Sequence, residues 1–408
     1  MARRRRGTNK LYSLINLRIN NFLDLISGTK PVAYDRTPRK RTVRKTMDTN
    51  IPDLAPFDIH SEFRPKSFDQ IVGQEIVKEF LKIKIKAFKK SKLSVGHCLF
   101  LGFSGAGKTT MANVMANEMG VGFHSVMATR IKTWADFYQI LKNINQNDVI
   151  FIDEIHALAP KIQEQLYGVM EDFVCTLDDK NLQRQIQVRI PRFTLIGATT
   201  HTGLLNGPLL SRFQYKGQLS QYTVEQLTDM VISAGKRIYK LNIPIEIAER
   251  IAKLSRKTAR TCYNLLRSYI DVVEAENSGK ISSNMLTLDL LFKTLKLEQI
   301  DPIIGLDMAS RKYLVTMIRE KMPIGCRSLA NMISEQESTL VDMIEPFLIS
   351  DIDLEFKDQT GNFKTITGPF AKITKKGRVA TQNAYSYIKL CTKLQENDKW
   401  FNNESLSV

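Results

Sequence analysis

The stretch Gly102-Phe103-Ser104-Gly105-Ala106-Gly107-Lys108-Thr109 decides the fold of this chain. It matches G-x-x-x-x-G-K-[ST], a pattern whose glycines let backbone N–H groups close around phosphates. The match follows an apolar run at 98–101 and precedes a predicted helix that starts near Thr110. The helix N-terminus adds positive potential, Lys108 reaches the β- and γ-phosphates, and the Thr109 hydroxyl binds Mg²⁺. The cofactors expected here are ATP and Mg²⁺. The predicted contacts are Gly102, Gly105, Ala106, Gly107, Lys108, Thr109 and Thr110.

A second motif, Val149 to Glu154, reads as a buried strand that ends in two carboxylates, 45 residues after Lys108. Next to a phosphate loop, Asp153 is expected to hold Mg²⁺ through water and Glu154 to polarise the attacking water. The alternative is that both carboxylates only cap the next helix, and the presence of the phosphate loop favours the catalytic role. His156 follows at once, and because a lone histidine is usually neither catalytic nor a ligand, we interpret it as a structural link with no catalytic role.

Around these motifs the chain divides into segments of different pattern. Short apolar strands, predicted at 98–101, 122–126, 148–152 and 193–198, alternate with helical stretches, as in a parallel sheet. Helices alone follow, and then helices with a basic hairpin, which are typical of a winged helix. The predicted fold is therefore α/β: a P-loop core with a parallel sheet, a helical lid and a C-terminal winged-helix domain. The predicted segments are 1–55, a basic extension; 56–219, the ATPase domain; 220–297, the lid; and 298–408, the winged-helix domain.

The charge of the chain is concentrated at its N-terminus. Residues 1–50 hold 13 Lys/Arg against 3 Asp/Glu, out of a net charge of +17 for the whole chain. This favours an anionic partner such as DNA, RNA or an acidic membrane surface, although a solvated tail fits too. Apolar residues at helical spacing predict an amphipathic helix over 9–26.

Five scattered cysteines without C-x-x-C pairs argue against zinc and disulfides and favour a reducing compartment. The Arg-rich start also fits a transit peptide. No apolar run is long enough for a membrane span, so we expect no membrane partner.

The segment from Arg64 to Gln74 resembles the one that precedes the phosphate loop in clamp loaders and in RuvB, both of the AAA+ class. Four later stretches resemble the RuvB family specifically: 116–121, 148–158, 170–172 and 193–200. The runs 323–349 and 377–381 resemble the RuvB winged helix, whereas clamp loaders end in a helical collar. Three departures stand out: the extension 1–55, Phe103-Ser104 in place of Pro-Pro, and 351–370 inside the wing region, read as a hairpin or loop.

The resemblance implies a hexameric ring that translocates on duplex DNA and drives branch migration of Holliday junctions. A RuvA-like partner loads such a motor, and the setting is the cytoplasm of a bacterium or of a phage host. The implied adenine contacts are Arg64, Pro65, Ile71 and Val72. Thr200, or its neighbour Thr199, is expected to be the sensor near the γ-phosphate. Arg260 matches the lid arginine, in a Thr-Ala-Arg run where the family has Thr-Pro-Arg.

Two arginines compete for the finger that reaches a neighbouring subunit's ATP. Arg184, before the 193–198 strand, is favoured by the resemblance, and Arg212 is expected to support it. Trans-acting fingers accelerate related chemistry about 10³–10⁵-fold. A hairpin at 172–184 is expected to contact a partner or DNA, and the alternative is an ordinary packed strand. The predicted phosphate contacts of the wing are Lys372, Lys375, Lys376 and Arg378.

Two other functions share parts of this pattern. A clamp-loader-like ATPase has the 64–74 segment and a Ser211-Arg212 pair, but the C-terminal domain counts against it. In an ATP-regulated DNA-binding scaffold, ATP sets assembly without turnover. Asp153, Glu154 and Arg184 argue against a scaffold, and an assay of ATP turnover discriminates the two functions.

Overall fold

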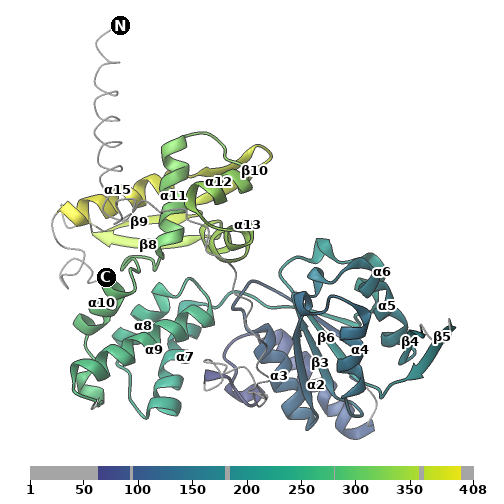
Figure 1. Cartoon of the computed structure of the whole chain (residues 1–408). Helices are drawn as coiled ribbons and strands as arrows, with labels where there is room; N and C mark the ends of the chain where they lie inside the picture. Colours follow the sequence, from purple (N-terminus) through teal and green to yellow (C-terminus); the bar gives the residue numbers. More distant parts are fainter. Residues whose placement is uncertain (1–62, 92–94, 180–183, 280, 358–362, 397–408) are drawn as a thin grey trace, which may run out of the picture.

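The computed structural model describes residues 63–91, 95–179, 184–279, 281–357 and 363–396. The basic extension 1–55, with the helix predicted at 9–26, lies outside the described residues. Three units follow one another along the chain (Figure 1): the ATPase unit (63–219), the lid (220–297) and the winged-helix unit (298–396). No helix in the described ranges is long and apolar enough to span a membrane.

The ATPase unit is built on a five-stranded sheet in the order β2-β3-β6-β1-β7, with every neighbouring pair parallel. Its strands are β1 (Cys98–Leu101), β2 (Phe123–Met127), β3 (Val149–Asp153), β6 (Thr194–Thr199) and β7 (Tyr215–Gln218). The predicted strand at 98–101 is confirmed, and the other three are confirmed with a shift of one residue. The order brings the ends of β1, β3 and β6 side by side, which is what assembles the site.

Helices cover both faces of this sheet (Figure 1). They are α2 (Glu75–Ser91), α3 (Lys108–Met119), α4 (Trp134–Lys142), α5 (Pro160–Glu171) and α6 (Gly207–Arg212). The short turns are η2 (Phe68–Gln70), η3 (Ala128–Arg130), η4 (Ile155–Ala157) and η5 (Thr202–Leu204). Alternate residues of β3 divide between two clusters: Phe151 packs with α2 and α3, and Ile152 packs with α4, α5 and α6. Because both faces are buried, the strands are apolar throughout rather than alternating.

An antiparallel hairpin, β4 (Val174–Asp179) with β5 (Arg184–Arg189), projects from the ATPase unit on the side away from the lid (Figure 1). The hairpin predicted at 172–184 is therefore present, but its second strand begins at Arg184 and runs five residues further. The RQIQVR run alternates polar and apolar residues, as a strand with one exposed face does.

The lid consists of α7 (Val224–Ala234), the π-helical turn η6 (Gly235–Tyr239), α8 (Ile245–Leu254), α9 (Ala259–Glu276), η7 (Ser283–Met285) and α10 (Leu288–Leu297). Thr223 caps α7 in a reciprocal capping box, and the Thr258 hydroxyl accepts from the N–H of Thr261 at the start of α9. Thr258 lies two residues before Arg260, and its cap fixes the start of α9 at Ala259. One hydrophobic cluster joins the lid helices and includes Phe63.

The winged-helix unit contains α11 (Met308–Glu320), α12 (Cys326–Ile333), α13 (Glu337–Thr339), the π-helical turn η8 (Leu340–Ile344), α14 (Glu345–Leu348) and α15 (Gln382–Glu396). Two antiparallel hairpins complete it: β8 (Ile352–Lys357) with β9 (Phe363–Gly368), and β10 (Ala371–Thr374) with β11 (Gly377–Ala380). Of the two readings of 351–370, a hairpin or a loop, the structure shows the hairpin. The basic hairpin β10–β11, which we call the wing, carries exposed lysines at its turn.

Arg378 does not join those lysines. Its guanidinium donates to both carboxylate oxygens of Glu345, at 2.8 and 3.3 Å, and the two side chains are 15% and 2% exposed. This charged pair holds β11 against the start of α14, and the hydrogen bond to Glu345 raises the pKa of Arg378. The contact of Arg378 with DNA phosphates stays a prediction, and Nε and Nη2 of its guanidinium are engaged by Glu345 inside the unit.

We expect Arg378→Ala to destabilise the winged-helix unit by about 3–5 kcal/mol, because it leaves the buried Glu345 carboxylate without its partner. Thermal unfolding followed by circular dichroism should show a lower melting temperature. The exposed Lys375→Ala, three residues away on the same hairpin, should leave the melting temperature unchanged. Equal melting temperatures for the two variants would contradict the assignment.

Candidate active site

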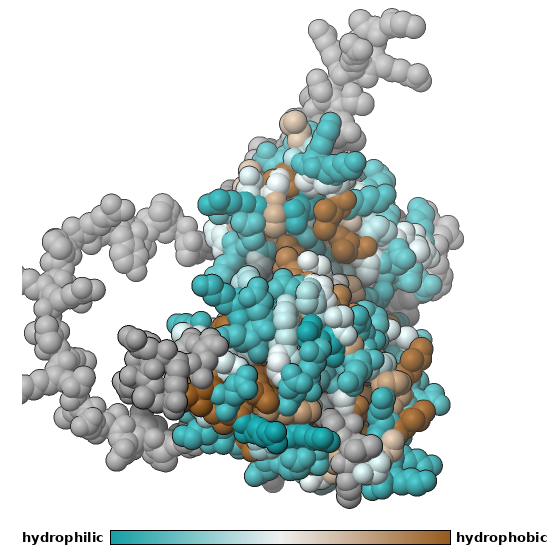
Figure 2. Space-filling model, turned by 90° about the vertical axis from the view of Figure 1, so that its right-hand side faces the viewer, coloured by the Kyte–Doolittle hydropathy of each residue, from teal (hydrophilic) through white to brown (hydrophobic). Residues whose placement is uncertain are grey.

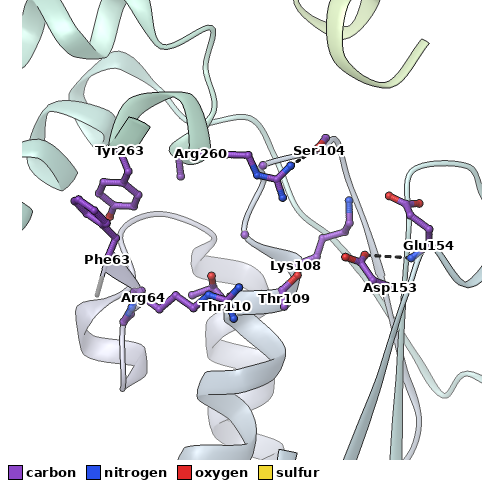
Figure 3. Close-up of a pocket in the computed structure, with 14 residues that line it drawn as sticks. Phe63, Arg64, Ser104, Lys108, Thr109, Thr110, Asp153, Glu154, Arg260 and Tyr263 are labelled. Atoms are coloured by element: carbon purple, nitrogen blue, oxygen red, sulfur yellow. Dashed lines mark hydrogen bonds between the residues drawn. The ribbon is translucent and has the colours of Figure 1, made fainter. Parts of the chain in front are cut away.

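A cleft opens between the phosphate loop, the end of β3 and the first turn of α9 (Figure 3). Eight of the predicted contacts line it: Arg64, Pro65, Gly105, Gly107, Lys108, Thr109, Thr110 and Arg260. Asp153 and Glu154 line it as well. The cleft therefore brings together the two motifs and the lid arginine.

The phosphate loop needs its glycines for conformation and for space. Gly107, which precedes α3, has φ 95°, and a Cβ there would lie 2.9 Å from the Tyr222 hydroxyl. That hydroxyl donates to the carbonyl of Ala106 at 3.1 Å, which ties the loop to the start of the lid. Ala106 and Gly102 shape the loop from behind and do not line the cleft.

Lys108 is 7% exposed, and its ammonium donates to the carbonyls of Gly102 at 2.7 Å and Phe103 at 3.2 Å. Burial lowers the pKa of Lys108, and the carboxylates of Glu154 and Asp153 act in the opposite direction. The ammonium is thus held at the loop by weak neutral acceptors. Phosphate oxygens, which are charged, are stronger acceptors for the same donors.

The two acidic residues differ in conformation. Asp153 ends β3 and accepts from the Glu154 N–H at 3.1 Å, while Glu154 has left-handed backbone angles, φ 48° and ψ 48°. A non-glycine residue in such a conformation costs about 1–3 kcal/mol, and residues of this kind cluster at functional sites. The conformation turns the Glu154 side chain away from Asp153 (Figure 3).

Glu154 meets the end of the neighbouring strand β6. Its Oε2 accepts from Thr200, whose N–H lies at 3.4 Å and whose hydroxyl lies at 3.3 Å. Thr199 is fully buried, and its hydroxyl accepts from the His201 N–H. Of the two sensor candidates, Thr200 is the one beside Glu154.

His156 links these two strand ends. Its Nδ1 lies 2.8 Å from the Thr199 hydroxyl and 3.3 Å from Glu154 Oε2. Burial lowers the pKa of His156. A histidine whose proton is disfavoured here serves as a neutral hydrogen-bonding link, in agreement with the structural role predicted for it.

On the lid side, Arg260 donates to the hydroxyl of Ser104 at 3.1 Å (Figure 3). Ser104 is one of the two residues that stand where the family has Pro-Pro, and a proline offers no such acceptor. The family resemblance therefore gave no reason to single out Ser104.

Two predicted adenine contacts lie elsewhere. Ile71 is 7% exposed and packs with α2 and α3, and Val72 packs against the lid cluster, so neither lines the cleft. Phe63 and Tyr263 line it instead, with ring centroids 4.8 Å apart. A sequence signal existed for both, since Phe63 directly precedes Arg64 and Tyr263 lies one helical turn after Arg260.

Further predicted residues lie outside the cleft. Arg212, at the end of α6, has its guanidinium 4.3 Å from the Tyr167 ring centroid and pairs with Glu171 at 3.2 Å. Arg184 begins β5, and its side chain is outside the described part of the chain. The wing residues belong to the separate winged-helix unit.

The donor set at the cleft fits a nucleotide-bound Mg²⁺. No group of three or more His, Cys, Asp or Glu side chains arranged for a metal occurs among the described residues. Mg²⁺ is usually held by one or two protein oxygens together with substrate phosphates and water, and Thr109 and Asp153 provide such oxygens here.

A parallel sheet in this order, a phosphate loop, an acidic strand end and a lid arginine define an AAA+ ATPase, here joined to a winged helix. Family models agree: the Holliday junction DNA helicase RuvB P-loop domain matches residues 63–219, and the RuvB C-terminal winged helix domain matches 303–356. The chain belongs to the RuvB family.

Individual relatives support the same assignment. The Holliday junction branch migration complex subunit RuvB of Myxococcus xanthus is 37% identical over 352 residues, covering 85% of this chain and 95% of that protein. The solved Thermotoga maritima RuvB Holliday junction branch migration motor superposes with a TM-score of 0.67 at 33% identity, covering 80% of this chain and 98% of that one. A proline-to-glycine variant of it gives the same TM-score at 34% identity.

Proposed function

We propose that the chain is an ATP-driven motor that moves Holliday junctions by translocating on duplex DNA. The observation that carries this is the joining, in one chain, of a complete ATP cleft to a winged helix with exposed basic residues. A clamp loader lacks the second part. We keep 56–219, 220–297 and 298–408 as the proposed domain boundaries.

The chemistry proposed for the cleft assigns one task to each residue. Lys108 and the loop N–H groups bind the β- and γ-phosphates, while Thr109 and Asp153 hold Mg²⁺, which neutralises charge on the transferring phosphoryl group. Glu154 orients and polarises the attacking water, and Thr200 positions Glu154. Arg260, which belongs to the lid, contacts the γ-phosphate side of the nucleotide, so that hydrolysis changes the angle between the lid and the ATPase unit.

We also propose that the working form is a ring of subunits, in which Arg212 reaches the ATP of the neighbouring subunit. Three solved variants of the Thermotoga protein each replace one residue: an alanine, a threonine or an arginine. The threonine lies 2 residues after the alanine, and the arginine lies 14 residues after it. Ala198, Thr200 and Arg212 repeat this spacing. For this reason we favour Arg212 over Arg184 as the finger for a neighbouring subunit.

The surroundings of Arg212 suit that task. Glu171, its ion-pair partner, is 56% exposed, while the Arg212 side chain is 22% exposed and also donates to the Pro208 carbonyl at 2.8 Å, so a neighbouring phosphate has to displace both acceptors. Leu204, 61% exposed, precedes α6. Apolar side chains also form separate patches among hydrophilic ones on the face that Figure 2 shows. A subunit contact at α6 would cover Leu204 and direct Arg212 outward.

The partners proposed beyond DNA are a RuvA-like junction-binding protein and other copies of the chain. The proposed location is the cytoplasm, consistent with five cysteines that are all free thiols.

The wing supplies the DNA contacts in this proposal. Lys375 and Lys376 form the turn between β10 and β11, and Lys372 is exposed on β10. Replacing all three with alanine should abolish both DNA-stimulated ATP hydrolysis and movement of a synthetic four-way junction, while hydrolysis without DNA persists. The log–log salt slope of duplex binding should also fall by about 0.9 for every lysine that no longer binds a phosphate.

Junction movement is measured with labelled synthetic junctions, with and without an added RuvA-type protein. The matched control replaces three exposed lysines of the ATPase unit, Lys86, Lys90 and Lys216, and should keep DNA stimulation. A wild-type protein that hydrolyses ATP on DNA but never moves junctions would favour a loader. Full stimulation in the wing variant would remove the wing from DNA binding.

A further inference from the structure

The winged-helix unit touches the ATPase unit beside the catalytic residues. Asp342, in the π-helical turn η8, lies with its Oδ1 2.9 Å from His201 Nε2 and 3.5 Å from the Thr200 hydroxyl. A carboxylate oxygen accepts, so His201 Nε2 donates in the first contact. These partners are 141 and 142 residues apart in sequence, and the contact therefore joins two units at the end of β6.

Thr200 stands between two carboxylates. Its hydroxyl lies 3.3 Å from Glu154 Oε2 and 3.5 Å from Asp342 Oδ1, but a hydroxyl has a single hydrogen to donate. Asp342 therefore competes with Glu154 for the proton of Thr200. While Asp342 occupies this place, the hydroxyl is not fully available to the catalytic glutamate.

The charge of Asp342 also bears on the nucleotide. Asp342 lines a small pocket together with Ser104 of the phosphate loop and Arg260 of the lid, and its charge acts to raise the pKa of Lys108. A carboxylate this close to the triphosphate site is repelled by bound phosphates. ATP binding and the contact between Asp342 and Thr200 consequently oppose each other.

A continuous series of contacts leads from this point to the wing. Glu345 begins α14 directly after η8, and it holds Arg378 of the wing strand β11 through the buried pair at 2.8 Å. A displacement of the wing is thus transmitted to the helical segment that carries Asp342. Coupling between sites is carried by packed and hydrogen-bonded networks of this kind, and only measured coupling establishes it.

We propose that Asp342 is a positioning residue for ATP hydrolysis, which restrains Thr200 until the winged-helix unit moves on DNA. Asp342 accepts from His201 and contacts Thr200, so the hydrogen bond between Thr200 and Glu154 depends on the position of the wing. The DNA-dependent part rests on the proposed function.

The test is ATP turnover by full-length Asp342→Ala, with and without duplex DNA. Turnover without DNA should rise about fivefold, the lower end of typical coupling between sites, because the contact at 3.5 Å is long. The ratio of DNA-stimulated to basal kcat should fall toward one, and KM for ATP should fall as well, because the carboxylate that opposes ATP binding is gone. A purely structural role would instead lower both rates together.

Lys257→Ala is the matched control, because the Lys257 ammonium donates to the Asp351 carbonyl at 2.6 Å and joins the lid to the winged-helix unit away from Thr200. It should leave basal turnover unchanged. If it matches Asp342→Ala, loosening of the units explains the effect and the proposal is overturned.

His201→Ala provides the second test. If Asp342 acts through the same contact, the double variant should raise basal turnover no more than either single variant. Additive effects would overturn the shared path. A wild-type protein without DNA stimulation would overturn the proposed function and the DNA-dependent part of this inference, while the basal rise in Asp342→Ala would still decide the rest.

Discussion

Glu154→Gln should bind ATP normally and hydrolyse it about 10²–10⁴-fold more slowly, the usual contribution of a positioned general base. Glutamine keeps the size of the side chain and an oxygen that accepts from Thr200, so the geometry at the strand ends survives. What disappears is the negative charge that polarises water. Binding persists because the phosphate loop, with Lys108, is unchanged.

Steady-state turnover and the affinity for a fluorescent ATP analogue separate these two effects. Glu164→Gln, which removes the same charge from the exposed side of α5, should leave both unchanged. Turnover at the wild-type rate in Glu154→Gln would exclude Glu154 from the chemistry, and Asp153 would then be the remaining acidic candidate at the cleft.

Arg212→Ala should abolish turnover as well, by about 10³–10⁵-fold, while each subunit still binds ATP. The reason is different: the ATP cleft of the same subunit stays intact, and the loss falls on the neighbour. Arg184→Ala is the comparison, and we expect it to retain turnover.

Mixing locates the arginine. Subunits with Arg212→Ala keep an intact cleft, and subunits with Lys108→Ala keep an intact arginine, so mixed interfaces that pair the two should regain hydrolysis. Mixtures that demonstrably assemble but show no activity would place the action of Arg212 within its own subunit. Loss of turnover in Arg184→Ala alone would restore that residue as the finger.

The sequence predicted those features that depend on local pattern. The phosphate loop, the acidic end of β3 and the strand positions follow from runs of a few residues whose spacing is fixed by the sheet and by phosphate binding. Phe63 and Tyr263 each lie close in sequence to a predicted contact, but they were missed because their meeting requires the lid to fold against the segment before α2.

Charge was the least informative signal. Arg378 stands next to Lys375 and Lys376 in a basic run, yet its partner is Glu345, 33 residues earlier. Ile71 was expected at the cleft because the 64–74 segment lies over the adenine in the family that it resembles, but the turn η2 between Pro65 and Ile71 sends Ile71 into the core. In both cases a tertiary contact decided the role of the side chain: an ion pair with Glu345 for Arg378, and packing in the core for Ile71.

The π-helical turn η8 restricts which changes of sequence this segment tolerates. An α-helix advances about 100° per residue, and a π turn accommodates one additional residue, so η8 sets the angular phase between the residues before it and those after it. Asp342 can therefore face His201 while Glu345 faces the interior of its own unit. Substitutions leave this phase untouched. The loss of a single residue from η8 would rotate one face relative to the other and separate the two contacts, so the length of this segment is constrained as well as the identity of Asp342 and Glu345.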